Sequence, residues 1–179
     1  AGRSGEVPPA LEKVDVSVHQ DNQPRPVVDL VPATGPKTSL DFVILVDDSL
    51  NTQLGTQLQD IKDFIHSLPE NSRIAVAYAA NGAARMQQNF TTDRAAAEKA
   101  VRLPLGRYQG ANGIYFALAD LIKKWPQGAA RREVLLISDG IDITYGVDAT
   151  SPGLNSPLDQ AISAAQRNNI TVYSLFASG

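Results

Sequence analysis

Residues 42–46, Phe-Val-Ile-Leu-Val, limit the fold more than any other part of the chain. Every position holds an apolar β-former, and the polar stretch 47–51 (Asp-Asp-Ser-Leu-Asn) follows directly. A strand that is apolar on both faces needs cover on both faces, which is typical of the centre of a parallel sheet between layers of helices. Residues 133–138 predict a second strand of this fully buried kind, and it also ends in a polar segment, Ser138-Asp139-Gly140.

The hydrophobic pattern changes period between these strands. From Leu54 to Leu68, leucine and isoleucine recur at spacings of four and three, which predicts a helix with one apolar face. The dipeptide Asn81-Gly82 is a strong hairpin signal. Strands alternating with helices indicate an α/β fold, so we expect a doubly wound, mostly parallel central sheet with helices on both faces. The other predicted elements are strands at 73–80, 85–90 and 171–177, a helix from about Asp93, and helices over 112–125 and 157–168.

Residues 1–39 differ from the rest of the chain. They are rich in proline, aspartate, asparagine and glutamine. Alternating valines predict a strand over residues 14–18, the segment QDNQPRP predicts a turn, and residues 27–31 predict a short return strand. We therefore expect an N-terminal extended arm or β-hairpin over residues 1–39, followed by the α/β domain over residues 40–179.

Charge and composition exclude several classes of function. The net charge of −3 gives no electrostatic reason to expect nucleic acid as a partner. The longest apolar runs fall far short of the roughly 20 residues that a transmembrane helix needs, so no transmembrane segment is expected. The chain contains no cysteine, which excludes disulfides, thiol catalysis and thiolate zinc sites.

Polar side chains at the ends of the two buried strands predict a binding site, because open α/β sheets bind ligands at the carboxyl ends of their strands. One class of protein with such acids is the phosphate-accepting receiver domain. It also needs an aspartate at the end of a later buried strand, and then a late lysine. Here residues 87–93 (QQNFTTD) do not predict such a strand, and no lysine follows the strand at 171–177. The receiver alternative therefore fails at two required residues.

The chain instead resembles the von Willebrand factor A (vWA) domain family over about residues 40–177. Residues 47–51 resemble the family's Asp-x-Ser-x-Ser loop, and residues 110–118 (GANGIYFAL) resemble its Gly-Gly-Thr loop with the following Ala-Leu. Ser138-Asp139-Gly140 resembles its Thr-Asp-Gly. In that family these three loops form a metal-ion-dependent adhesion site. The N-terminal arm is similar to the lead-in of secreted bacterial vWA proteins, which implies an extracytoplasmic or secreted location.

The resemblance implies a variant metal site at Asp47, Ser49, Asn51, Asn112 and Asp139. Asn51 stands where the family has a second serine, and Asn112 where it has a threonine. Magnesium and calcium accept amide carbonyl oxygens as ligands, so a site with asparagine ligands is one alternative. Amide N–H groups would also satisfy the two carboxylates directly, with no metal bound. The sequence leaves both alternatives open.

These features predict a non-enzymatic protein-interaction or adhesion module. In the metal-bound alternative, an acidic side chain from a partner protein would complete the coordination of the cation. Family members normally continue with one more strand and a C-terminal helix, so the resemblance implies that residues 171–177 form an exposed apolar edge. The second alternative is therefore a metal-free structural or assembly subunit that binds its partner, either another protein or a further copy in an oligomer, by strand addition at this edge.

A metal-dependent hydrolase is the third alternative. The two histidines, His19 and His66, have no serine or carboxylate partner at a recognisable spacing, and the chain has no Gly-x-Ser-x-Gly motif. We therefore expect no enzymatic activity.

Overall fold

The computed structural model describes residues 10–31, 39–50, 52–106, 113–128, 130–141 and 155–177. The chain divides into two compact units, residues 1–35 and residues 36–179. Asn51 and Asn112 lie outside the described residues.

The N-terminal unit contains a small antiparallel hairpin, in which β1 (Val18–Gln20) pairs with β2 (Gln23–Arg25). The hairpin was predicted, but its strands were placed wrongly at 14–18 and 27–31. Asp21 and Asn22, with φ of 52° and 60°, form a two-residue turn. They lie within residues 20–26, all of which were predicted as turn. Positive φ at both central positions matches the twist of a hairpin, so pairing begins beside them. Val14 and Asp15, expected in a strand, belong to a 3₁₀ turn over Lys13–Asp15.

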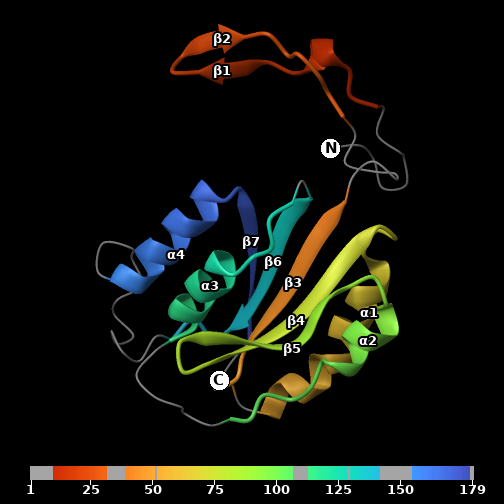
Figure 1. Cartoon of the computed structure of the whole chain (residues 1–179), viewed down its shortest axis with the longest axis vertical. Coiled ribbons are helices and arrows are strands. Elements are labelled where there is room, and N and C mark those ends of the chain that lie inside the picture. Colours follow the sequence, from red (N-terminus) through yellow and green to blue (C-terminus); the bar gives the residue numbers. More distant parts are fainter. Residues whose placement is uncertain are drawn as a thin grey trace. The chain divides into compact units, whose positions relative to one another are not determined.

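The second unit has a five-stranded sheet in the order β5-β4-β3-β6-β7 (Figure 1). The strands are β3 (Leu40–Asp47), β4 (Ser72–Ala80), β5 (Ala83–Thr91), β6 (Arg131–Ser138) and β7 (Ile170–Phe176). Only β5 runs antiparallel, and it joins β4 through Asn81-Gly82. The predicted mostly parallel α/β sheet is therefore confirmed.

Helices cover both faces of this sheet (Figure 1). The helices are α1 (Leu58–Ser67), α2 (Arg94–Lys99), α3 (Ile114–Lys123) and α4 (Ser156–Arg167). Side chains on β3 alternate between two cores: Phe42 and Ile44 pack with residues of α1, whereas Val43 and Leu45 pack with residues of α3 and α4. This alternation explains why β3 is buried at all eight positions.

Two helix starts illustrate the local signals. Asp93 caps α2, where its side chain accepts a hydrogen bond from the Ala96 amide at 3.1 Å, as the sequence predicted. The first α-helix was predicted from Leu54, but residues Thr52–Gln57 form a 3₁₀ helix and the α-helix begins at Leu58. Gly55 lies within this 3₁₀ segment, and glycine disfavours the α-helix.

The strand β6 is less buried than predicted. Leu135 is only half-buried, although it lies near the centre of the strand. On the α1 side of the sheet, α1 packs over the β3 half, so the β6 and β7 side chains on that face line an open groove. None of the described helices is long and apolar enough to span a membrane.

Candidate functional site

Asp47 is the last residue of β3, and β3 lies between β4 and β6 in the sheet. The chain passes from β3 outward to β4 and β5, and then returns to the other side of β3 for β6 and β7. The carboxyl ends of β3 and β6 therefore form the point where the strand order reverses. Ligands of doubly wound sheets bind at this point.

Both oxygens of the Asp47 carboxylate accept hydrogen bonds from serines. Ser49 donates to Oδ1 through its amide at 3.0 Å and its hydroxyl at 2.6 Å. The Ser138 hydroxyl, at the end of β6, donates to Oδ2 at 3.1 Å. Asp47 is 6 % exposed, so the two serines satisfy a carboxylate that has little access to water.

Burial raises the pKa of Asp47 above its ordinary value. The hydrogen bonds from Ser49 and Ser138 act in the opposite direction, and the negative charge of Asp139 adds to the rise in pKa. The site therefore places two carboxylates near each other in a partly desolvated position. A nearby positive charge would stabilise the ionised form of both groups.

Asp139 follows β6 and is half-buried. Its Oδ1 accepts a hydrogen bond from the Ile141 amide at 2.9 Å, which fixes the side chain on its own loop. The Ser138 hydroxyl meanwhile accepts one from the Gly140 amide at 3.0 Å. The structure thus brings together Asp47, Ser49 and Asp139 of the five predicted site residues.

The described residues fit part of a site for a hard cation. The Ser49 hydroxyl gives its proton to Asp47, so its lone pairs are available to a ligand, and Ser49 itself is exposed. Hydroxyl and carboxylate oxygens are donors that magnesium and calcium accept. Within the described ranges there is no cluster of three or more His, Cys, Asp or Glu. Further ligands would therefore come from Asn51, Asn112, water or a partner.

The sequence did not reveal the role of Asp48, the neighbour of Asp47. Its carboxylate accepts a bidentate pair of hydrogen bonds from Arg102, at 2.7 and 3.0 Å. It is 6 % exposed. Nothing in the spacing of these two residues, 54 positions apart, would have indicated the contact. Asp48 is thus committed to an internal ion pair.

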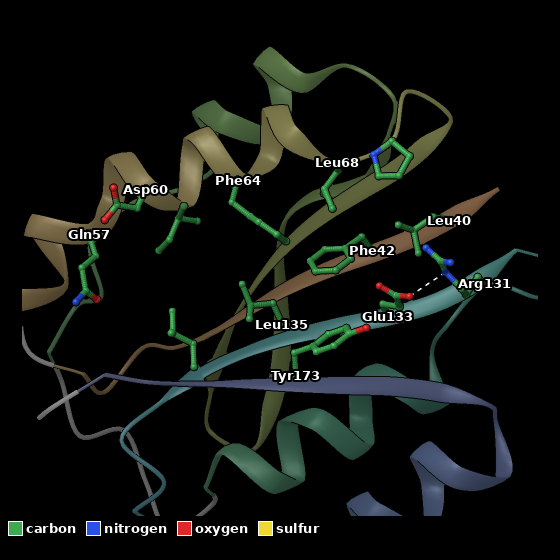
Figure 2. A pocket seen from close by; sticks show the side chains of 13 residues that line it. Leu40, Phe42, Gln57, Asp60, Phe64, Leu68, Arg131, Glu133, Leu135 and Tyr173 are labelled. Carbon is green, nitrogen blue, oxygen red and sulfur yellow. Dashed lines mark ion pairs between the residues drawn. The ribbon is translucent and has the colours of Figure 1, made fainter. Parts of the chain in front are cut away.

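A second candidate surface lies on the α1 side of β6 and β7. A groove of about 700 Å³ runs between α1 and these strands. Phe64 of α1 and Leu68, the residue just after this helix, lie on one side, while Leu135 and Tyr173 line the opposite side (Figure 2). Leu175 of β7 continues the apolar lining. Because β7 is the last strand of the described sheet, this groove ends at an unpaired sheet edge.

The edge strand exposes large apolar side chains. Tyr173 is 48 % exposed, Leu175 40 % and Phe176 71 %. Soluble proteins usually shorten, charge or cover such an edge, because it offers unpaired backbone groups to other chains. The edge and the groove beside it are therefore a candidate surface for a protein partner.

The strand order, the two helical layers and the polar site at the switch point define a doubly wound α/β domain of the vWA or Rossmann-like class. No protein-family model matches the chain, and no curated protein is similar to it in sequence. Solved structures with this fold are similar to it in three dimensions.

One is the conserved hypothetical protein BatB from Bacteroides thetaiotaomicron, with a TM-score of 0.56 and 19 % identity over 78 % of this chain and 66 % of that chain. Another is an aerotolerance-related membrane protein from Bacteroides fragilis, with a TM-score of 0.55 and 20 % identity over 76 % of this chain and 67 % of that chain. The chain thus spans about two thirds of the length of each of these two proteins.

A third similar structure is proximal thread matrix protein 1 from the mussel byssus, with a TM-score of 0.52 and 17 % identity. The match covers 76 % of this chain and 35 % of that chain. At these low identities, the three similarities show a shared fold.

Proposed function

We propose that this domain is a non-enzymatic protein-interaction module with a variant metal-ion-dependent adhesion site. The observation that carries the proposal is the pair of serine hydroxyls on Asp47 at the junction of β3 and β6. Asp47, Ser49, Asn51, Asn112 and Asp139 would hold a magnesium or calcium ion. When bound, the cation would offer an open coordination position to an acidic side chain of the partner.

In this proposal some residues would contact the cation, and others orient those residues by hydrogen bonds. The Asp47 carboxylate orients the Ser49 hydroxyl through a 2.6 Å hydrogen bond, and it supplies negative charge. Ser138 holds the other oxygen of Asp47 and thereby links the β3 loop to the Asp139 loop. Such outer hydrogen bonds orient the groups that contact a metal.

The surroundings of the histidines support a non-enzymatic role. His66 Nε2 lies 3.1 Å from Glu98 Oε2 on the surface, between α1 and α2, a carboxylate contact that the sequence did not indicate. His19 lies on the exposed hairpin strand β1. Both positions are typical of solvated structural histidines. An assay of the purified protein against generic ester and phosphate substrates tests the hydrolase alternative.

An extracytoplasmic or secreted location is part of the proposal. Two proteins of the same fold, the aerotolerance-related membrane protein and the byssus thread protein, bear names that place them at a membrane or outside the cell.

Thermal unfolding tests the cation site. Protein stripped with EDTA is unfolded alone and with millimolar Mg²⁺, Ca²⁺ or Mn²⁺. A ligand at 100 times its dissociation constant adds about 2.7 kcal/mol to the folded state. At 2–4 °C per kcal/mol this raises the midpoint by roughly 5 to 11 °C. Asp47→Ala should abolish the shift, whereas the exposed Asp159→Asn should retain it. No shift with any cation would reject the metal site.

The exposed edge supports a second candidate function, strand addition by a partner or by another copy at β7. The observation that favours it is the apolar edge formed by Tyr173, Leu175 and Phe176 beside the groove. An added strand would pair with the outward backbone groups of β7, and its side chains on one face would lie over the groove. This role needs no metal.

Sedimentation and hydrogen exchange of the full chain test this second function. Association through the edge should protect those β7 amides that do not bond to β6. Leu175→Lys should remove that protection and the associated species. The control is Ile162→Lys on α4, because Ile162 is 37 % exposed and Leu175 is 40 % exposed. A monomer whose outward β7 amides all exchange at unprotected rates would contradict strand addition between copies.

A further inference from the structure

Asp48 and Arg102 join the loop after β3 to a distant segment of the chain. Besides the two bonds from Arg102, Asp48 Oδ1 accepts a hydrogen bond from the Leu105 amide at 3.0 Å. The backbone carbonyl of Asp48 accepts one from the Gly106 amide at 3.1 Å. Residues 102–106 are therefore attached to Asp48 by its side chain and by its backbone. Asp48 also donates its own amide to Ala79 of β4 at 3.2 Å.

Arg102 is fixed by a buried tyrosine. The guanidinium carbon lies 3.8 Å from the centre of the Tyr78 ring, a cation–π contact. The Tyr78 hydroxyl accepts a hydrogen bond from the Arg102 amide at 2.7 Å and donates one to the Arg102 carbonyl at 2.6 Å. Tyr78 has no exposed surface. The side chain and both backbone groups of Arg102 are thus held on β4.

A second aspartate–arginine pair at the other end of β3 gives a comparison. Arg73 donates to both oxygens of Asp41, at 2.7 and 2.6 Å, and lies 5.5 Å from the Phe90 ring centre. Asp41 is 1 % exposed. This pair joins two neighbouring strands at positions that are already in register. It resembles the Asp48 pair in chemistry and burial, but it holds no loop.

We infer that Asp48 and Arg102 are positioning residues of the Asp47 site, an inference that rests on the proposed cation site. They hold residues 102–106 against the loop that carries Asp47 and Ser49. From Gly106 only six residues lead to Gly113, the N-cap of α3. The pair therefore sets where the chain leaves the β3 loop on its way to α3. It also neutralises Asp48, so that the charge of the site comes from Asp47 and Asp139.

Electrostatics and positioning predict opposite effects when Arg102 is replaced. Arg102→Met leaves a carboxylate uncompensated beside the site, and added negative charge alone would tighten cation binding. Loss of positioning would weaken it. Asp48→Asn leaves the positive charge of Arg102 uncompensated, so charge and lost positioning both predict weaker cation binding in that variant. Whether cation binding becomes tighter or weaker in Arg102→Met therefore separates the two explanations.

The first experiment measures Mn²⁺ binding by electron paramagnetic resonance, which detects the free ion. Asp48→Asn and Arg102→Met should each weaken binding about tenfold or more, as is typical when the outer shell of a metal site is removed. The matched variants Asp41→Asn and Arg73→Met should change Mn²⁺ binding less than about twofold. Asp41 lies at the opposite end of β3 from Asp47, about 20 Å away at the rise of a strand, and salt screens charges over that distance. Equal or tighter binding by Arg102→Met would overturn the positioning role. Arg102→Lys keeps the charge without the bidentate geometry, and serves if Arg102→Met fails to fold.

The second experiment needs no cation. Hydrogen exchange in EDTA follows the amides of Leu105 and Gly106, both of which bond to Asp48. These two amides should exchange at least about tenfold faster in Asp48→Asn and Arg102→Met than in Asp41→Asn and Arg73→Met. All variants are compared at the same number of degrees below their own thermal unfolding midpoints. A tenfold change corresponds to a modest loss of local stability. Unchanged exchange would overturn the inference. If the wild-type protein binds no Mn²⁺, the proposed cation site fails, and exchange alone decides whether the pair positions this segment.

Discussion

Ser138 donates a hydrogen bond to Asp47 across 91 positions of sequence, at 3.1 Å, where β6 and β3 end side by side. The parallel pairing of these strands runs to Val46 and Ile137, the residues just before the two hydrogen-bonded side chains. The sheet register therefore sets the distance between the two loops. The affinity of a ligand that contacts both loops would therefore depend on the register between β3 and β6.

The pH dependence of stability should show the raised pKa of Asp47. Because the pKa of Asp47 in the folded protein lies above its ordinary value of 3.8, the folded state binds more protons than the unfolded state around and above that pH. Stability from this group is then complete below about pH 4 and is lost as pH rises through the folded pKa. In EDTA, the free energy of unfolding of wild type minus that of Asp47→Asn should fall as pH rises from 3.5 to 7. Urea titrations measure it.

Asp159→Asn, at an exposed aspartate on α4, is the control for that experiment. A wild-type advantage over Asp47→Asn that grows with pH would mean that the hydrogen bonds from Ser49 and Ser138 outweigh burial, and that the pKa of Asp47 is lowered.

Removing the Tyr78 hydroxyl should destabilise the fold. Tyr78→Phe leaves the Arg102 amide and carbonyl without the partner that they have at 2.7 and 2.6 Å. A buried polar group left unsatisfied costs about 1–3 kcal/mol, to be measured by urea unfolding. Tyr173→Phe, at a tyrosine that is 48 % exposed, should stay within about 0.5 kcal/mol of wild type. Equal effects of the two variants would argue against the Tyr78–Arg102 bonds.

The turn between β4 and β5 should depend on glycine. Gly82 has a φ of 68°, and Asn81 has a φ of 52°. A side chain at such a left-handed position costs about 1–2 kcal/mol, so Gly82→Ala should lower the free energy of unfolding by that amount. Gly128 is the matched control, because a Cβ there meets no atom within 4 Å. A Gly82→Ala variant as stable as Gly128→Ala would contradict the turn conformation.

Phe176 should tolerate charge if the protein is monomeric. Phe176 is 71 % exposed on the edge strand, so Phe176→Lys should change the free energy of unfolding by less than about 0.5 kcal/mol. Ile137→Ala on the adjacent strand, at a residue with no exposed surface, should cost about 2–5 kcal/mol. If Phe176→Lys were as costly as Ile137→Ala at high protein concentration, another copy would be covering the edge in solution.

Several local features followed from the sequence alone. The apolar run of β3, the Asn81-Gly82 turn and the Asp93 cap each depend on residues within a few positions of one another. Short-range periodicity and turn chemistry are sufficient for such elements. The N-terminal hairpin shows how such signals compete. There the Asp21-Asn22 turn determined the position of the strands, while the alternating valines did not.

The sequence also determined which end of the sheet is polar, because strand ends carry Asp47 and Ser138-Asp139. Tertiary structure decided what these groups do. Asp47 meets Ser138 only because β3 pairs with β6, and the charge of Asp48 is directed to Arg102 because Tyr78 holds that arginine on β4. Likewise, the half-buried Leu135 reflects where α1 packs, not its own apolar character. Contacts between residues far apart in sequence depend on packing and register, which no local pattern encodes.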